Sequence, residues 1–134
     1  MGFESDFVDV RTRDGRNVIL LAPIIYTSRD YGRLTLPRGM FSDGASTPPA
    51  VWPWLPPFGE YWKPALAHDA AYKNLLLDEA GRPLGLPRSA ADTLLREMME
   101  SCRVDTAQLE AIYEGVRIGG SWAFAEDRTS RGGA

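Results

Sequence analysis

A chain of 134 residues is long enough for one globular domain with its own core, without metal or disulfide support. The 44% hydrophobic and 25% charged shares are those of a soluble globular protein. The net charge is −3 and bases are interspersed with acids, so no nucleic acid partner is expected, because phosphate binding needs a localised basic face. The single cysteine, Cys102, excludes an internal disulfide.

No charged-then-apolar leader starts the sequence, and no apolar run reaches the roughly 18 residues of a membrane-spanning helix. We therefore expect a protein without signal peptide or transmembrane segment, located in the cytoplasm of the cell that produces it.

Residues 1–36 are predicted to form a small N-terminal antiparallel sheet. Apolar-rich runs before residue 11 and over residues 17–21 flank Asp14-Gly15, a strong hairpin signal because both turn residues must tolerate positive φ. Residues 33–36 alternate leucines with polar neighbours, as a half-exposed strand does.

Residues 37–63 are predicted to form an ordered loop. Six prolines preclude a continuous helix or a central strand there. The segment also carries too many tryptophans and other apolar residues to remain solvated, so we expect it to pack against the helices. Long ordered loops in compact domains are usually functional, or else their assignment as loops is wrong. The motif Phe41-Ser42-Asp43-Gly44-Ala45-Ser46 lies near the start of this loop.

Residues 64–125 are predicted to be helical. Pro64 suits a first helical turn, and the alanines and leucines that follow favour a helix over residues 64–77. A second helix is expected over residues 89–102, and a third begins near Asp105-Thr106, where capping residues are available. The sequence thus predicts one α+β domain over residues 1–128, followed by a flexible tail over residues 129–134.

One candidate site centres on His68, the only histidine. On a helix, His68 and Tyr72 share a face, while Asp69 projects about 100° away. If the first two helices pack antiparallel, Asp92 can approach His68 from the facing helix. A carboxylate on one ring nitrogen fixes the imidazole tautomer and makes the other nitrogen a better base, as general-base catalysis requires.

Asp69 could instead meet the loop that carries Asp43 and Gly44. Carboxylate and carbonyl oxygens together suit a hard cation such as Ca²⁺. A cation there would stabilise the oxyanion that forms when water attacks an ester or a similar carbonyl group.

A purely structural interpretation stands beside this one. A single histidine next to an aspartate is more often a satisfied structural residue than a catalyst, and Tyr72 suits a core or a hydrogen-bond network better than proton donation. The tryptophans of the loop suit the core, although exposed aromatic groups would suit a membrane surface or a protein partner.

Taken in order, these motifs resemble a family of small uncharacterised proteins of tailed bacteriophages and prophages. The resemblance spans about residues 36–122 and rests on Asp43-Gly44-Ala45-Ser46, on His68-Asp69-Ala70-Ala71-Tyr72 and on Ala91-Asp92. The middle of the chain is also similar to the secreted prokaryotic phospholipases A2, which share an Asp-Gly-x-Ser loop, a His-Asp-x-x-Tyr helix and an aspartate on a facing helix. The chain departs from the phospholipases in its N-terminal sheet and in carrying Ala45, Ala67 and Ala71 where they place cysteines near the motif.

The phospholipase resemblance implies that His68 activates water, that Asp92 orients it and that Tyr72 supports the pair. It also implies that Asp69, Asp43 and the carbonyl of Gly44 hold Ca²⁺. The leading expectation is a phage-encoded phospholipase-A2-like hydrolase that acts on lipid or another ester at the host envelope. The alternative is a non-catalytic virion, tail or assembly protein with this scaffold, whose partners would be phage structural proteins.

Overall fold

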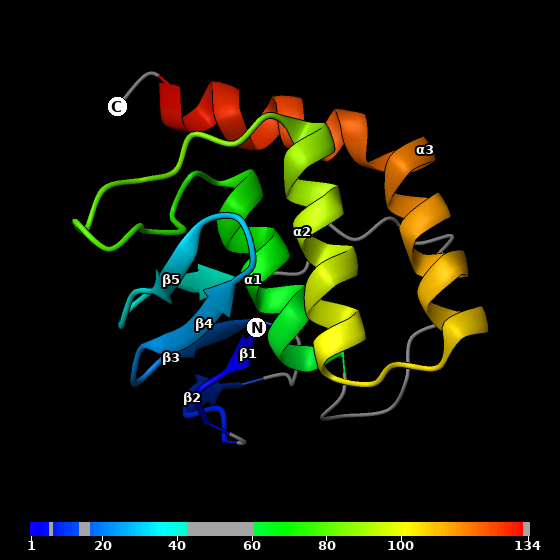
Figure 1. Ribbon diagram of the computed structural model, residues 1–134. Helices are drawn as coiled ribbons and strands as arrows, with labels where there is room; N and C mark the ends of the chain where they lie inside the picture. The colour runs from blue at the N-terminus through cyan, green and yellow to red at the C-terminus, as the bar shows by residue number, and fades with distance from the viewer. Residues whose placement is uncertain (6, 14–16, 43–60, 133–134) are drawn as a thin grey trace.

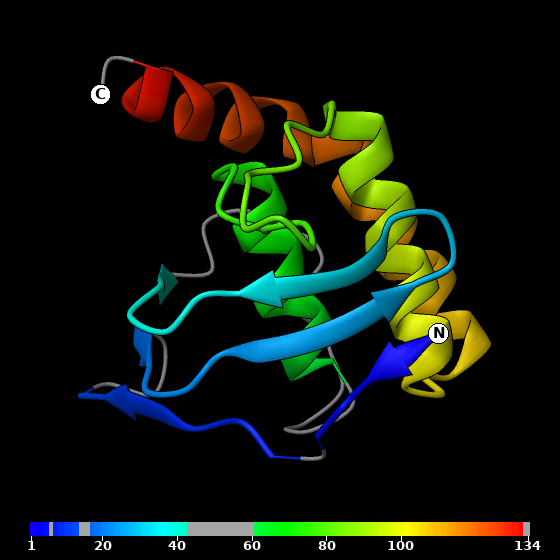
Figure 2. The ribbon, with the colours of Figure 1, turned by 60° about the vertical axis from the view of Figure 1, so that its left-hand side comes forward.

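The computed structural model describes residues 1–5, 7–13, 17–42 and 61–132, and only the backbone of residues 120–132. Its N-terminal part contains two antiparallel sheets of three strands each (Figure 2). The first has the order β1-β4-β5 and the second the order β2-β3-β6. The strands are β1 (Gly2–Phe3), β2 (Val10–Thr12), β3 (Val18–Leu20), β4 (Ile24–Ser28), β5 (Gly32–Leu36) and β6 (Phe41–Ser42).

The first sheet buries one face by strict alternation. In β4 the side chains of Ile24, Tyr26 and Ser28 are buried, and the partner strand β5 buries Leu34 and Leu36. This is the period-2 pattern of a sheet with one face on the core.

The outer edge of β5 is paired rather than open. Leu77 exchanges two backbone hydrogen bonds of 3.0 Å with Thr35, and Leu77 also forms a bridge to Pro83. The connection between the first two helices therefore extends this sheet and covers an edge that would otherwise expose unpaired backbone groups.

Three helices follow the strands: α1 (Trp62–Tyr72), α2 (Arg88–Ser101) and α3 (Thr106–Gly132). Helix α2 contacts both α1 and α3 (Figure 1). One core cluster joins both sheets with α1 and α2, and a second joins α2 with α3. Helix α3 changes direction part-way along (Figure 1), and the pair Gly119-Gly120 in its middle lowers the cost of such a bend.

The α+β class with an N-terminal antiparallel part is confirmed, but there are two sheets rather than one. The predicted hairpin strands pair, as β2 with β3, while its turn, residues 14–16, lies outside the described residues. Within the predicted loop, residues 41–42 form β6, and residues 43–60 lie outside the described residues.

Two helix boundaries differ from the predicted ones. Helix α1 ends at Tyr72 rather than near residue 77, because Asn74 adopts φ 58° and Leu77 pairs with Thr35 instead. Helix α3 continues to Gly132, so most of the residues predicted as a tail are helical. The predicted cap of α3 is confirmed, since Asp105 Oδ2 accepts hydrogen bonds from the N–H groups of Ala107 (3.1 Å) and Gln108 (3.4 Å).

Within the described part of the chain, no helix is both long enough and apolar enough to cross a membrane.

Candidate functional site

Helix α1 is buried on nearly all sides, and this places its polar residues inside the protein. Every residue from Leu66 to Tyr72 is buried. Three alanines in that stretch, Ala67, Ala70 and Ala71, let neighbouring elements approach closely. A helix enclosed all round carries no amphipathic stripe, so His68 and Asp69 must find partners within the protein.

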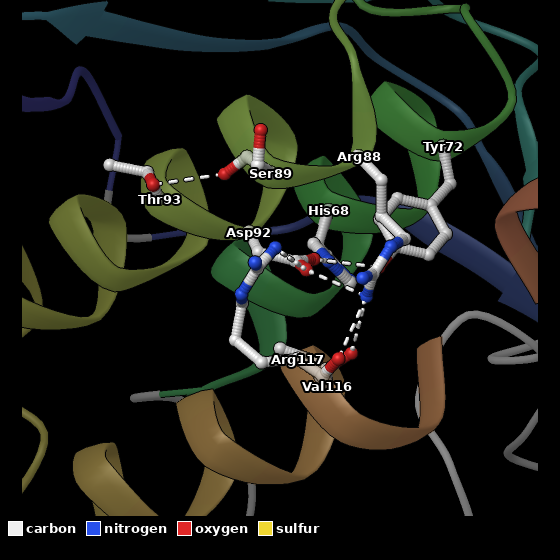
Figure 3. Close-up of polar contacts among 8 residues, drawn as sticks. All are labelled: His68, Tyr72, Arg88, Ser89, Asp92, Thr93, Val116 and Arg117. Atoms are coloured by element: carbon white, nitrogen blue, oxygen red, sulfur yellow. Dashed lines mark hydrogen bonds and ion pairs between the residues drawn. The ribbon is translucent and has the colours of Figure 1, made fainter. Parts of the chain in front are cut away.

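His68 and Asp92 meet across the α1–α2 interface. The Nε2 atom of His68 lies 2.7 Å from Oδ1 of Asp92, and neither side chain is exposed to solvent. Figure 3 shows the imidazole of α1 directed at the carboxylate of α2. The contact that the sequence left conditional on helix packing is therefore formed.

Tyr72 completes the contact from one turn further along α1. Its hydroxyl donates to the same Oδ1 of Asp92 at 2.6 Å, and its ring lies 4.2 Å from the His68 ring, centroid to centroid. Burial, reinforced by the hydrogen bond to Asp92, raises the pKa of Tyr72 above its ordinary value. The phenol therefore keeps its proton and acts as a donor that holds the carboxylate in place.

Two arginines face the other oxygen of Asp92. The Nη1 atoms of Arg88 and Arg117 lie 3.6 and 3.5 Å from Oδ2 (Figure 3). These distances are those of ion pairs rather than of strong hydrogen bonds. Arg88 also donates to the carbonyl oxygens of Arg117 (2.9 Å) and Val116 (3.4 Å), which ties the start of α2 to α3.

These contacts indicate which of the two residues donates the hydrogen in the contact between His68 and Asp92. Asp92 accepts the Tyr72 hydroxyl hydrogen at Oδ1 and faces two guanidinium groups at Oδ2, so it acts as the acceptor and His68 Nε2 donates its hydrogen to it. Nδ1 then has a lone pair, and it is buried with no hydrogen-bond partner among the described residues. An oriented imidazole with one free basic nitrogen is the form that a general base requires.

Asp69 lies beside this network but pairs elsewhere. Its side chain is 1% exposed, and Lys73 Nζ lies 3.0 Å from Oδ2 as an ion pair. Neither carboxylate oxygen accepts a hydrogen bond from the described residues. The aspartate is therefore neutralised by a cation from its own helix.

Of the three predicted calcium ligands, only Asp69 lies among the described residues. No group of three or more histidines, cysteines or acids that could hold a metal lies among them, and Asp69 already faces an ammonium group. The other two predicted ligands, Asp43 and Gly44, lie outside the described residues. Calcium binding thus stays a prediction.

Three residues of the site were not predicted from the sequence. Lys73 and Arg88 stand four residues from Asp69 and Asp92, a spacing that brings helical side chains together and was visible in the sequence. Arg117 had no such signal, because its approach to Asp92 depends on where α3 crosses α2. Ser89 and Thr93, joined by a hydrogen bond of 2.9 Å, lie apart from the network (Figure 3).

The raised pKa of Tyr72 predicts a loss of stability at alkaline pH. Above the ordinary tyrosine pKa of 10.0 the unfolded chain ionises while the folded chain keeps its proton, so the free energy of unfolding falls as pH rises. Burial and Glu97 raise the pKa of Tyr26 as well, so both tyrosines contribute to the slope. Tyr72→Phe should flatten the slope measured by urea unfolding between neutral pH and about pH 11.

Tyr31→Phe, which replaces an exposed tyrosine, provides the control and should keep the slope of the native chain. An unchanged slope in Tyr72→Phe would show that the phenol proton is not held by the fold.

No curated protein and no solved structure matches the chain. A family model with the description "Protein of unknown function (DUF1353)" matches residues 18–116. The match includes His68, Tyr72, Arg88 and Asp92 and ends one residue before Arg117. With most of its length covered by that model, the chain belongs to the DUF1353 family.

Proposed function

We propose that this protein is a phage-encoded hydrolase of the phospholipase A2 type, which cleaves an ester of a lipid or a similar substrate at the host envelope. The observation that carries the proposal is the 2.7 Å contact between His68 Nε2 and Asp92 Oδ1, which leaves Nδ1 as a nitrogen with no hydrogen-bond partner in the described part of the chain. The phage setting and the lipid substrate rest on the resemblance of the ordered motifs.

The proposed chemistry assigns one task to each residue of the network. Nδ1 of His68 takes a proton from water while the water oxygen bonds to the ester carbonyl carbon. Nδ1 then returns the proton to the alcohol oxygen as the carbon–oxygen bond breaks. Asp92 stabilises the imidazolium that exists between these two transfers, and Tyr72 holds Asp92 in position through the 2.6 Å hydrogen bond.

Replacing the base tests this proposal. Ester hydrolysis is measured on phospholipid vesicles and on a soluble chromogenic ester, so that lipid and other esters are distinguished. His68→Gln should lower the rate by about 10²–10⁴-fold, which is the usual contribution of a general base. Tyr72→Phe should lower it less, because the His68–Asp92 contact remains.

Tyr26→Phe is the matched control. It removes another hydrogen bond from a buried tyrosine to a carboxylate, 2.6 Å to Glu97, away from His68, and should keep the native rate. Because His68 is the only histidine, ¹⁵N-histidine NMR checks the ring directly and should show hydrogen on Nε2 and none on Nδ1. Hydrolysis that is absent in the native chain, or unchanged in His68→Gln, would overturn the enzymatic proposal.

A non-catalytic role in the phage virion, its tail or its assembly is the second candidate. The observation that favours it is the complete enclosure of His68 and Asp92, whose side chains are 0% exposed. A buried polar network can also serve to fix one packing of two helices. A native chain that binds phage structural proteins but hydrolyses no ester would establish this role.

A further inference from the structure

We infer that Lys73 is the resident cation of Asp69 and occupies the place that the sequence assigned to calcium, so that this site works without a divalent ion. A carboxylate that is 1% exposed must be neutralised, because an unpaired buried charge is strongly unfavourable. Lys73 Nζ, 3.0 Å from Oδ2, is the one cation ion-paired with Asp69 among the described residues.

Lys73 is held at this position by more than Asp69. It is the C-cap residue of α1, where the helix dipole favours a positive charge. The acid precedes the base by four residues, which is the more favourable order on a helix. The ammonium group also lies 3.5 Å from the carbonyl oxygen of Phe41 and 5.5 Å from the centroid of the Phe41 ring, so it is fixed between α1 and β6.

This geometry opposes a calcium ion on Asp69. Calcium needs six to eight oxygen ligands, and anionic ligands must balance its two positive charges. Here the carboxylate already compensates an ammonium group, and that group would lie within a few ångströms of the metal and repel it. The Lys73 side chain is only 12% exposed, so it could not simply withdraw into solvent without breaking its contacts with β6.

Calcium titration together with a double-mutant cycle tests the inference without any assay of activity. The melting temperature of the native chain should be the same in EDTA and in millimolar Ca²⁺, since a ligand that binds only the folded state would raise it. Lys73→Met should lower the melting temperature by about 5 °C or more, because Asp69 is left buried without a partner. Lys73→Met combined with Asp69→Asn should recover part of this loss.

Lys73→Arg changes the shape of the side chain but keeps its positive charge, and it is therefore the control for the change in shape. Its melting temperature should stay close to that of the native chain. Two results would overturn the inference: a calcium-induced rise in the native melting temperature that Asp69→Asn abolishes, or strictly additive effects of the Lys73 and Asp69 substitutions. Both readouts are independent of ester hydrolysis, so a protein without enzymatic activity can still confirm the Lys73–Asp69 pair.

Discussion

Asp92→Ala is expected to lower the free energy of unfolding by about 3–5 kcal/mol, the usual cost of removing one partner of a buried ion pair. The substitution leaves the Tyr72 hydroxyl and the His68 Nε2–H, both buried, without their acceptor. It also leaves two guanidinium groups, those of Arg88 and Arg117, without the carboxylate between them. Urea unfolding at neutral pH measures the loss.

Glu100→Ala provides the control on the same helix. Glu100 pairs with Arg96 at 3.4 Å, but both side chains are well exposed, so its removal should cost about 1 kcal/mol or less. Asp92→Asn should lower the free energy of unfolding by less than Asp92→Ala and by more than Glu100→Ala. An amide still accepts a hydrogen bond at its oxygen, but it presents an NH₂ group to the arginines. Equal losses in Asp92→Ala and Glu100→Ala would show that the network does not hold α1 against α2.

The two partners of the His68–Asp92 contact could be predicted, because the position of each on its own helix follows local rules. The spacing of His68 and Tyr72 places them on one face of a helix whatever the rest of the chain does. The alanine-rich sequence of α1 allows a neighbouring helix to approach, and Asp92 lies in the first turns of that neighbour. Only the packing of the two helices had to be assumed.

Other features could not be predicted because tertiary contacts override local preference. Residues 75–77 are three leucines with high helix propensity, yet Leu77 leaves the helical path and pairs with Thr35 of β5. Arg117 reaches Asp92 only because the packing of α3 brings it there. The pairing of Lys73 with Asp69 could have been predicted from their spacing on the helix. The calcium hypothesis instead placed Asp69 in a site with Asp43.

Ile112→Ala is expected to cost about 2–5 kcal/mol, because it leaves a cavity where α3 packs on α2. Ile112 is fully buried in the cluster that joins these two helices, together with Leu95 and Met99 of α2. Urea unfolding measures the loss. Helix α3 also carries Arg117 and the carbonyl oxygens to which Arg88 donates hydrogen bonds. We therefore expect Ile112→Ala to weaken the contacts of both arginines with Asp92 as well.

Ile118→Ala makes the matched control, since it is the same substitution in the same helix at a side chain that is 80% exposed. Both variants gain the same small helix propensity from alanine, so the difference between their unfolding free energies isolates the burial of Ile112. A difference below about 1 kcal/mol would mean that α3 is not docked through this cluster. In that case the position of Arg117 beside Asp92 would have to depend on the hydrogen bonds from Arg88 to the carbonyl oxygens of Val116 and Arg117.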